Sequence, residues 1–266
     1  MTDATLSVSR VSWRNGATAV DTDSVVAEVP VALVYNGISH VVMMATPADL
    51  EDLALGFSLS EGIISAPEQL LDSELHQRDR GLELEITVTN QCFTALKTRR
   101  RNLTGRTGCG LCGLESLEQA MPDLAPLDCE DVIEHRALQT ALASLDTAQT
   151  LKRHTGGVHG AAWCDPQGVI EILREDVGRH NALDKMLGAR VSSGQLGHGF
   201  VLVTSRASYE MVAKVASCGI GILAAVSAPT SLAIEQANAC GLTLVGFVQP
   251  GRHVVYTHPQ RIVEGG

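Results

Sequence analysis

The most regular hydrophobic pattern lies near the C-terminus. Three short apolar runs, at residues 199–205, 220–227 and 242–248, are separated by segments with apolar residues at helical spacing, 206–219 and 228–241, each of which ends at a glycine. Strands that are apolar along their whole length and are joined by single helices are typical of right-handed β-α-β crossovers in a parallel sheet covered on both faces. The pattern therefore predicts an α/β domain.

A ligand site is expected where these strands end, because ligands of such sheets bind at the carboxyl ends of the strands. The segments that follow the strands carry hydroxyl and guanidinium groups next to helix N-termini, and both features bind anions. The alternative is that the serines and threonines only cap the helices they precede. The expected binding residues are Ser205, Arg206 and Ser208 after the first strand, Ser227 and Thr230 after the second, and residues 249–252 after the third.

A second polar cluster is predicted at a strand-to-helix corner upstream. Residues 169–176 have the pattern of a strand, and residues 178–188 that of a helix whose Leu183, Met186 and Leu187 face the core. An acid, a guanidinium, an imidazole and an amide crowd the corner between them, which is more than the capping of one helix requires. We expect these groups to form part of a binding site, although caps and ion pairs are the alternative. They are Asp176, Arg179, His180 and Asn181.

The N-terminal part has a different pattern. Between residues 25 and 88, short β-like runs flank one helix-like segment, with Thr46 as its expected N-cap, Pro47 at its first position and Gly62 at its end. Residues 91–113 show no clear period, and they contain four glycines and five basic residues. The predicted organisation is a small α+β domain at 1–90, a mobile Gly/Arg-rich loop at 91–118 and a larger α/β domain at 119–266.

Composition and charge narrow the classes of protein. With 266 residues, of which 45% are apolar and 3% aromatic, the chain can bury a sizeable core. A net charge of −10 argues against a general nucleic-acid-binding protein, which needs a basic surface. The chain does not begin like a signal peptide, and no apolar run approaches the roughly 18 residues of a membrane span. We therefore expect a soluble cytoplasmic protein with no membrane association, whose seven cysteines are reduced thiols.

The CxxC pair Cys109 and Cys112, in the stretch TGCGLCG, is the main candidate for chemistry. A structural zinc site needs four ligands, and the sequence has no second CxxC or HxxxH at usable spacing. A zinc deaminase places a glutamate two residues after its ligand histidine and a P-C-x-x-C motif downstream. Here Ala161 stands two residues after His159, and the CxxC lies upstream. We therefore expect no metal site.

Two thiol-based interpretations of the pair remain. In a thioredoxin-like dithiol the CxxC opens a helix that follows a strand, whereas here glycines surround the pair. The basic residues from Lys97 to Arg106 are expected to stabilise thiolates by direct charge, unless they only form a solvated run. Two adjacent thiolates suit the transfer of a small soft group, and sulfane sulfur carried as a persulfide is the natural example.

Seven segments together resemble the formate dehydrogenase accessory sulfurtransferase (FdhD) family, namely GRTGCGLCG, GGVHGAAWCD, REDVGRHNALDK, TSRASYEMVAKVA, AAVSAPTSLAI, GLTLVGFV and YTHPQRI. The resemblance runs from about Asn36 to Ile262. It implies homodimers and a larger domain with a cytidine deaminase-like three-layer α/β/α fold that lacks the zinc chemistry. It also implies that Cys109 carries the persulfide with Cys112 as its partner. The family's guanine-dinucleotide contact segment falls on Phe247, Val248, Gln249, Pro250, Gly251 and Arg252.

The resemblance also implies a function. A member of this family takes sulfur from a cysteine desulfurase and transfers it to the molybdenum (or tungsten) bis(molybdopterin guanine dinucleotide) cofactor, its bound substrate, which formate dehydrogenase requires. The expected partners are the desulfurase, formate dehydrogenase, the guanine dinucleotide cofactor and a second copy of the chain. Two alternatives stay open: a non-catalytic chaperone that binds the molybdenum cofactor without moving sulfur, and a zinc hydrolase on the deaminase-like scaffold.

Overall fold

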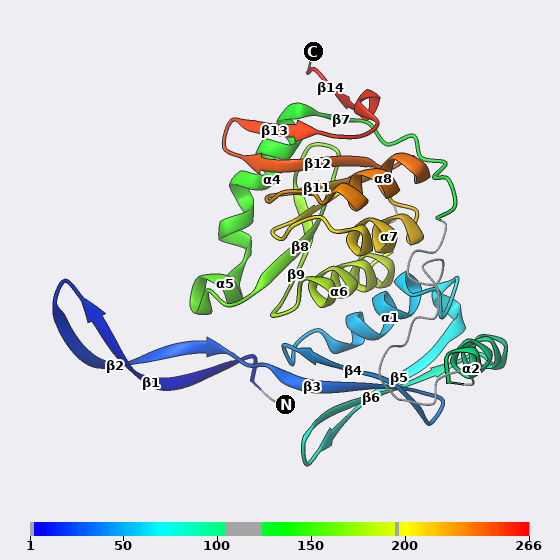
Figure 1. The fold of residues 1–266 in the computed structure, drawn as a ribbon, viewed down its shortest axis with the longest axis horizontal. Coiled ribbons are helices and arrows are strands. Elements are labelled where there is room, and N and C mark those ends of the chain that lie inside the picture. Colours follow the sequence, from blue (N-terminus) through cyan, green and yellow to red (C-terminus); the bar gives the residue numbers. More distant parts are fainter. Residues whose placement is uncertain (1–2, 105–123, 195–196, 266) are drawn as a thin grey trace.

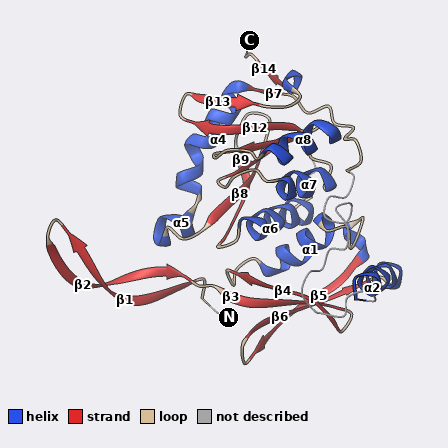
Figure 2. Cartoon of the chain, in the orientation of Figure 1, coloured by secondary structure: helices blue, strands red, loops and turns tan. Residues whose placement is uncertain are grey.

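The computed structural model describes residues 3–104, 124–194 and 197–265 (Figure 1). Cys109 and Cys112 lie outside these ranges. The described chain forms a larger α/β domain, a smaller α+β domain and an extended N-terminal hairpin, which Figure 2 shows as helices and strands. None of the described helices is long and apolar enough to cross a membrane.

The larger domain is built on a six-stranded sheet with the order β13-β12-β11-β10-β8-β9. Strands β10, β11 and β12 pair in parallel, as the apolar runs predict, and the other pairs are antiparallel. The central strands are fully apolar because both faces of the sheet are covered. The strands are β8 (His159–Cys164), β9 (Ile170–Asp176), β10 (Phe200–Val203), β11 (Ile222–Ala225), β12 (Thr243–Gln249) and β13 (Arg252–Val255).

Helices cover both faces of this sheet, so the domain has three layers (Figure 1). One face packs against α6 (Arg179–Ser192), α7 (Tyr209–Ser217) and α8 (Ser231–Cys240) around a core that includes Trp163. The other face packs against α4 (His135–Ala148). This confirms the α/β class and the two predicted crossover helices. The remaining elements are α5 (Thr150–Thr155), β7 (Ile133–Glu134), the 3₁₀ turn η2 (Pro259–Arg261) and β14 (Ile262–Val263).

The smaller domain is a four-stranded sheet with the order β4-β3-β6-β5, and α1 packs on it. Alternate residues of β6 are buried, so one face of the strand lines the core and the other is more exposed. This agrees with the predicted α+β character. The elements are β3 (Val29–Tyr35), β4 (Ile38–Ala45), α1 (Leu50–Ser60), the 3₁₀ turn η1 (Pro67–Gln69), β5 (Leu70–Arg78) and β6 (Gly81–Val88).

The predicted loop that begins at residue 91 was wrong in its first part, because helix α2 spans Asn90–Thr104. Cys92 and Leu96 are buried and Phe93 packs beside them, all against the core of the smaller domain. These three residues share one face of the helix. The apolar face contains only these three residues before the basic residues begin. Arg99 donates to the carbonyls of Glu61 and Gly62 and so satisfies the C-terminus of α1.

Helix α1 begins later than predicted. Its first residue is Leu50, and its N-cap is Asp49 in the left-handed conformation. Thr46, the expected cap, is instead fully buried, and its hydroxyl accepts a hydrogen bond from the backbone N–H of Val177 in the other domain. The hydroxyl that was expected to cap α1 therefore makes a hydrogen bond to the other domain instead.

The N-terminal hairpin, which the sequence analysis did not predict, projects away from both domains (Figure 1). Strands β1 (Thr5–Arg14) and β2 (Ala17–Val26) pair over their whole length. The turn between them is Asn15-Gly16, both with positive φ, which is the two-residue turn that matches the twist of a hairpin. This dipeptide was the available signal for the hairpin.

The two domains meet where α1 crosses α6 at a pair of glycines. A Cβ added to Gly56 would lie 1.7 Å from the carbonyl oxygen of Asp184, and one added to Gly188 would lie 2.0 Å from that of Asp52. The backbones of the two helices are therefore in direct contact, and only glycine fits at these positions.

Candidate functional site

The three segments that follow the parallel strands lie side by side and form one rim. The backbone N–H of Ala207 donates to the carbonyl of Ala228, and that of Thr230 donates back to Ala207. The N–H of Phe247 donates to the carbonyl of Ser227. The structure thus brings the predicted strand-end residues together, as parallel topology requires.

The first segment carries a hydroxyl that does not cap its helix. Ser208 is the N-cap residue of α7 but makes no side-chain cap, and its Oγ is buried without a hydrogen-bond partner among the described residues. Arg206 is exposed and meets no acid in the described ranges. Ser205 is buried, and its hydroxyl donates to the carbonyl of Arg206. Ser208 Oγ and the Arg206 guanidinium therefore have no protein partner within the described residues, while the hydroxyl of Ser205 already has one.

In the second segment, one of the two predicted hydroxyl residues caps a helix, as the alternative interpretation expects. Thr230 Oγ1 accepts a hydrogen bond from the N–H of Ala233 at 3.2 Å and caps α8. Ser227 is half-buried at the end of β11 and binds Phe247 through its backbone. The hydroxyl of Thr230 thus stabilises the helix, and the α8 N-terminus faces the rim through its backbone.

The third segment is a turn that begins with a strained residue. Phe247 has φ 51° at the bulge where β12 loses register with β13, and its ring lies 5.9 Å from the guanidinium of Arg252. Gln249, Pro250, Gly251 and Arg252 are exposed at the tip. Val248 is fully buried in the core against α4, so the contact predicted for it can involve only its backbone.

The strand-to-helix corner supplies two of its four predicted residues to the rim. Arg179 Nε is buried without a hydrogen-bond partner among the described residues. His180 Nε2 lies 2.8 Å from a carboxylate oxygen of Glu210 in α7. Burial is the main cause that lowers the pKa of His180, and the nearby Glu210 carboxylate only partly opposes it. Burial also lowers the pKa of nearby His159, with Arg179 as the next cause.

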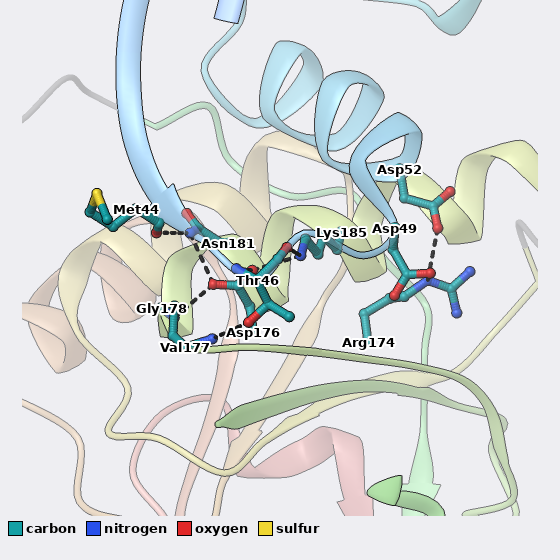
Figure 3. A network of polar contacts seen from close by, with 10 residues as sticks. All are labelled: Met44, Thr46, Asp49, Asp52, Arg174, Asp176, Val177, Gly178, Asn181 and Lys185. Carbon is teal, nitrogen blue, oxygen red and sulfur yellow. Dashed lines mark hydrogen bonds and ion pairs between the residues drawn. The ribbon is translucent and has the colours of Figure 1, made fainter. Parts of the chain in front are cut away.

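Asp176 and Asn181, the other two corner residues, lie in a network of polar contacts between the two domains (Figure 3). Asp176 is fully buried and accepts hydrogen bonds from the N–H groups of Thr46 and Gly178, from Asn181 Nδ2 and from Lys185 Nζ. Asn181 Nδ2 also donates to the carbonyl of Met44. These contacts join the two domains and occupy both carboxylate oxygens of Asp176 and the Nδ2 group of Asn181, while cofactor contacts of this pair stay a prediction.

A second buried network crosses the same joint. Asp184 accepts hydrogen bonds from Ser60 Oγ at 2.7 Å and from Lys214 Nζ at 3.0 Å, and Lys214 also reaches Glu61. Neither Lys185 nor Lys214 was predicted from the sequence to take this role. Lysines in the middle of otherwise apolar helix faces, as at these two positions, were the signal that a buried partner exists.

Three residues with metal-binding side chains in and before β8, namely His154, His159 and Cys164, do not come together. His154 is exposed on α5, where its Nδ1 contacts the carbonyl of Thr150. His159 and Cys164 stand at opposite ends of β8. Cys164 is fully buried in the core, and burial raises the pKa of its thiol. These three side chains therefore cannot share one ion.

The electrostatics of the rim favour an anion. Arg179, Arg206 and Arg252 form no ion pair within the described residues, although the chain as a whole carries a net charge of −10. The N-termini of α7 and α8 point to the same edge and add their positive dipole ends. Arginines of this kind bind phosphates with two parallel hydrogen bonds. The arrangement can hold an extended polyphosphate group.

Comparison with known proteins supports a relationship over nearly the whole chain. The FdhD/NarQ family model matches residues 26–263. The sulfur carrier protein FdhD of Cupriavidus necator is 55% identical over 262 residues, which cover 98% of this chain and 90% of that protein. A crystal structure of a candidate formate dehydrogenase accessory protein from Desulfotalea psychrophila has a TM-score of 0.76 at 25% identity, and it covers 98% of this chain and 100% of that one.

The family match begins at Val26, the last residue of the N-terminal hairpin, and ends at the last strand. It therefore includes both domains, the joint between them and the rim. The segments from GRTGCGLCG to YTHPQRI, which indicated this relationship in the sequence, all lie inside it. The chain is a member of the FdhD/NarQ family.

Proposed function

We propose that this protein is a sulfur carrier that receives sulfur from a cysteine desulfurase as a persulfide on Cys109 and transfers it to the molybdenum bis(molybdopterin guanine dinucleotide) cofactor for formate dehydrogenase. The family membership and the sulfur carrier relative support the general role. The CxxC motif supplies two thiols three positions apart. The cofactor is the substrate in this scheme, and the protein needs no resident metal.

The observation that carries the proposal is the unsatisfied, positive rim. Ser208 Oγ and Arg179 Nε are buried polar atoms without partners in the described ranges, and such groups cost free energy unless a ligand satisfies them. Arg206 and Arg252 stand exposed on the same edge. A guanine dinucleotide offers a pyrophosphate to the arginines and a planar base to the exposed turn. The fit of these groups to such a ligand supports binding of the cofactor here.

The sulfur steps balance as thiol exchange. The Cys109 thiolate attacks the outer sulfur of the donor's persulfide, and the donor cysteine leaves as a thiolate. Cys109 then carries the sulfur as a persulfide. In the release step Cys112 attacks the Cys109 sulfur, so that a disulfide forms and the outer sulfur leaves as sulfide to the cofactor. An external dithiol then reduces the disulfide and restores both thiols.

Finer features of the family stay proposals for this chain. The strand order and the three layers are compatible with a cytidine deaminase-like scaffold, and we keep that assignment as part of the proposal. A homodimer and complexes with the desulfurase and with formate dehydrogenase are likewise expected. A zinc hydrolase is disfavoured because His154, His159 and Cys164 lie apart.

Mass spectrometry after incubation with a cysteine desulfurase and cysteine tests the carrier role. We expect the peptide that contains Cys109 to gain one sulfur, and the gain to disappear in Cys109→Ala. A Cys109→Ala, Cys112→Ala double variant that still matures formate dehydrogenase would contradict sulfur transfer and leave the alternative of a non-catalytic molybdenum-cofactor chaperone. A folded control is Cys218→Ala, which removes a cysteine of α7's C-terminus and should keep full activity.

Binding of GDP, a probe for the guanine nucleotide end of the cofactor, tests the rim. We expect Arg252→Ala and Ser208→Ala to weaken binding, because one removes a phosphate donor and the other an unpartnered hydroxyl. Arg153→Ala on α5 is a matched control, since Arg153 is exposed and donates only to the carbonyl of Thr147. Equal affinity in all these variants would contradict the placement of the substrate on the rim.

A further inference from the structure

We propose that Gln139 of α4, with the hydrogen-bonded pair His135 and His253, is a positioning device that holds the turn at residues 250–252 for the guanine nucleotide and releases it on acidification. This inference rests on the proposed function, because it concerns the same rim. Helix α4 covers the face of the sheet opposite to α7 and α8. Gln139 therefore contacts the turn from the side of the sheet that α4 covers.

Gln139 contacts the turn with both ends of its amide. Its Oε1 accepts a hydrogen bond from the N–H of Gly251 at 2.9 Å. Its Nε2 lies 3.4 Å from the carbonyl oxygen of Arg252 and 3.3 Å from His253 Nδ1. The N–H of Gly251 can only meet an acceptor, so the amide has one orientation, and its two N–H groups serve the two remaining contacts. A single side chain thus fixes two successive residues of the turn.

The same contacts determine the tautomers of both histidines. Because Gln139 donates to His253 Nδ1, that nitrogen carries no proton and the ring proton is on Nε2. His253 Nε2 lies 2.7 Å from His135 Nδ1 and donates to it, so the proton of His135 is on Nε2. The two ring planes are 22° from parallel with 4.9 Å between centroids, so the rings meet edge to edge at this hydrogen bond. The hydrogen bonds from Gln139 to His253 and from His253 to His135 are made together only when both imidazoles are neutral.

Protonation breaks this chain of hydrogen bonds. A proton on His253 Nδ1 would face the N–H of Gln139, and a proton on His135 Nδ1 would face the N–H of His253. Burial, followed by His135, lowers the pKa of His253, which favours its neutral form. The charged groups nearby are Arg252 on β13, whose guanidinium lies at Phe247, and Glu134 and Arg136 at the start of α4, which pair with each other. A proton on His253 Nδ1 therefore competes with the N–H of Gly251 for Gln139 Oε1, and the turn is loosened as His253 takes up that proton.

The test compares GDP affinity at pH 7.5 with histidine NMR. We expect Gln139→Leu to weaken GDP binding at least about fivefold, the effect of about one net hydrogen bond, with unchanged melting temperature. Gln139→Asn, which is too short to reach Gly251, should behave in the same way and serves as the second variant if Gln139→Leu does not fold. Thr140→Val, the next residue on the exposed face, is the matched control because its hydroxyl contacts only Arg136 of the same helix.

Nitrogen-15 spectra give a readout that a purely structural role would not move. We expect both His135 and His253 as Nε2–H tautomers in the wild type, and loss of the defined tautomer of His253 in Gln139→Leu. In Gln139→Glu one carboxylate oxygen can accept from the N–H of Gly251 and the other from a protonated His253 Nδ1, so the loss of GDP affinity on acidification should be smaller than in the wild type. The comparison with Gln139→Glu separates this effect from the titration of His159 and His180 on the rim.

The outcomes separate the two hypotheses. If Arg252→Ala weakens GDP binding and the Gln139 variants do not, the positioning role is wrong and the proposed function stands. If the pH profile of Gln139→Glu overlays that of the wild type, the acid release is wrong. If the wild type does not bind GDP, the substrate placement fails and the positioning role fails with it.

Discussion

Replacing Gly188 by alanine tests how the two domains are joined. The added Cβ would lie 2.0 Å from the carbonyl oxygen of Asp52 and 2.9 Å from the backbone nitrogen of Gly56 in α1. Real Cβ atoms do not approach other atoms within 3.0 Å. Both partners are backbone atoms of a helix, so no side chain can move to make room. The two helices must therefore separate by about 1 Å at this point.

The cost follows from the hydrogen bonds that cross the joint. Ser60 Oγ to Asp184 is 2.7 Å and Lys185 Nζ to the carbonyl of Thr46 is 2.9 Å. A separation of about 1 Å takes both beyond the range of a good hydrogen bond. Hydrogen bonds to charged groups contribute about 1.5–3 kcal/mol each. The higher helix propensity of alanine stabilises the folded state by about 1 kcal/mol, so the free energy of unfolding should fall by about 2–5 kcal/mol in total.

Urea unfolding followed by tryptophan fluorescence measures this loss, because Trp163 is buried in the core that α6 covers. Gly197→Ala is the control: an added Cβ there meets nothing within 4 Å, and the glycine has no positive φ. We expect it to change the free energy of unfolding by less than about 0.5 kcal/mol. A Gly188→Ala protein that is as stable as the wild type, or more stable by the helix propensity alone, would refute the backbone contact.

Three further changes test other parts of the structure. Lys185→Met leaves the carboxylate of Asp176 buried without its cation and should cost about 3–5 kcal/mol in urea unfolding; a loss below about 1 kcal/mol would argue against the buried pair. Thr230→Ala removes a helix cap and should cost about 1 kcal/mol, whereas Ser208→Ala should leave the melting temperature unchanged; equal costs would contradict the difference in their hydrogen bonds. The pKa of His180 is lower in the folded than in the unfolded protein, so its contribution to the free energy of unfolding is present at pH 7 and is lost as the pH falls below about 6.5. Subtracting the pH profile of His180→Asn from that of the wild type isolates this contribution. A contribution that increases on acidification would contradict the direction of the pKa shift.

The sequence predicted the larger domain well because its elements are local patterns. The fully apolar runs became the parallel strands β10, β11 and β12, and glycines at 219 and 241 follow the crossover helices with positive φ. It failed where a tertiary contact changes a local signal. Thr46 has the sequence features of an N-cap, but its hydroxyl accepts a hydrogen bond from Val177. Helix α2 is stabilised by a narrow apolar face that packs on the smaller domain.

The candidate site was predicted only as a region. Parallel topology places Arg206, Ser208 and Arg252 on one rim, and no long-range information is needed for that. The corner residues could not be divided in the same way. Arg179 and Asp176 lie three positions apart, but Asp176 is buried against Thr46 of the other domain. Which residue joins domains and which faces a ligand depends on how the domains pack, and the local sequence does not contain that.

Ser208 and Thr230 show what the structure adds to such a prediction. Both are hydroxyl residues at the N-cap of a helix that follows a parallel strand, and their sequence patterns support capping and ligand binding equally. Thr230 makes its cap, whereas Ser208 leaves its Oγ buried and without a partner in the described chain. A hydroxyl that caps is already satisfied, and only the uncapped one gains a hydrogen bond from a ligand. If the rim binds a guanine nucleotide, Ser208 is therefore the hydroxyl whose removal should change the affinity more than the stability.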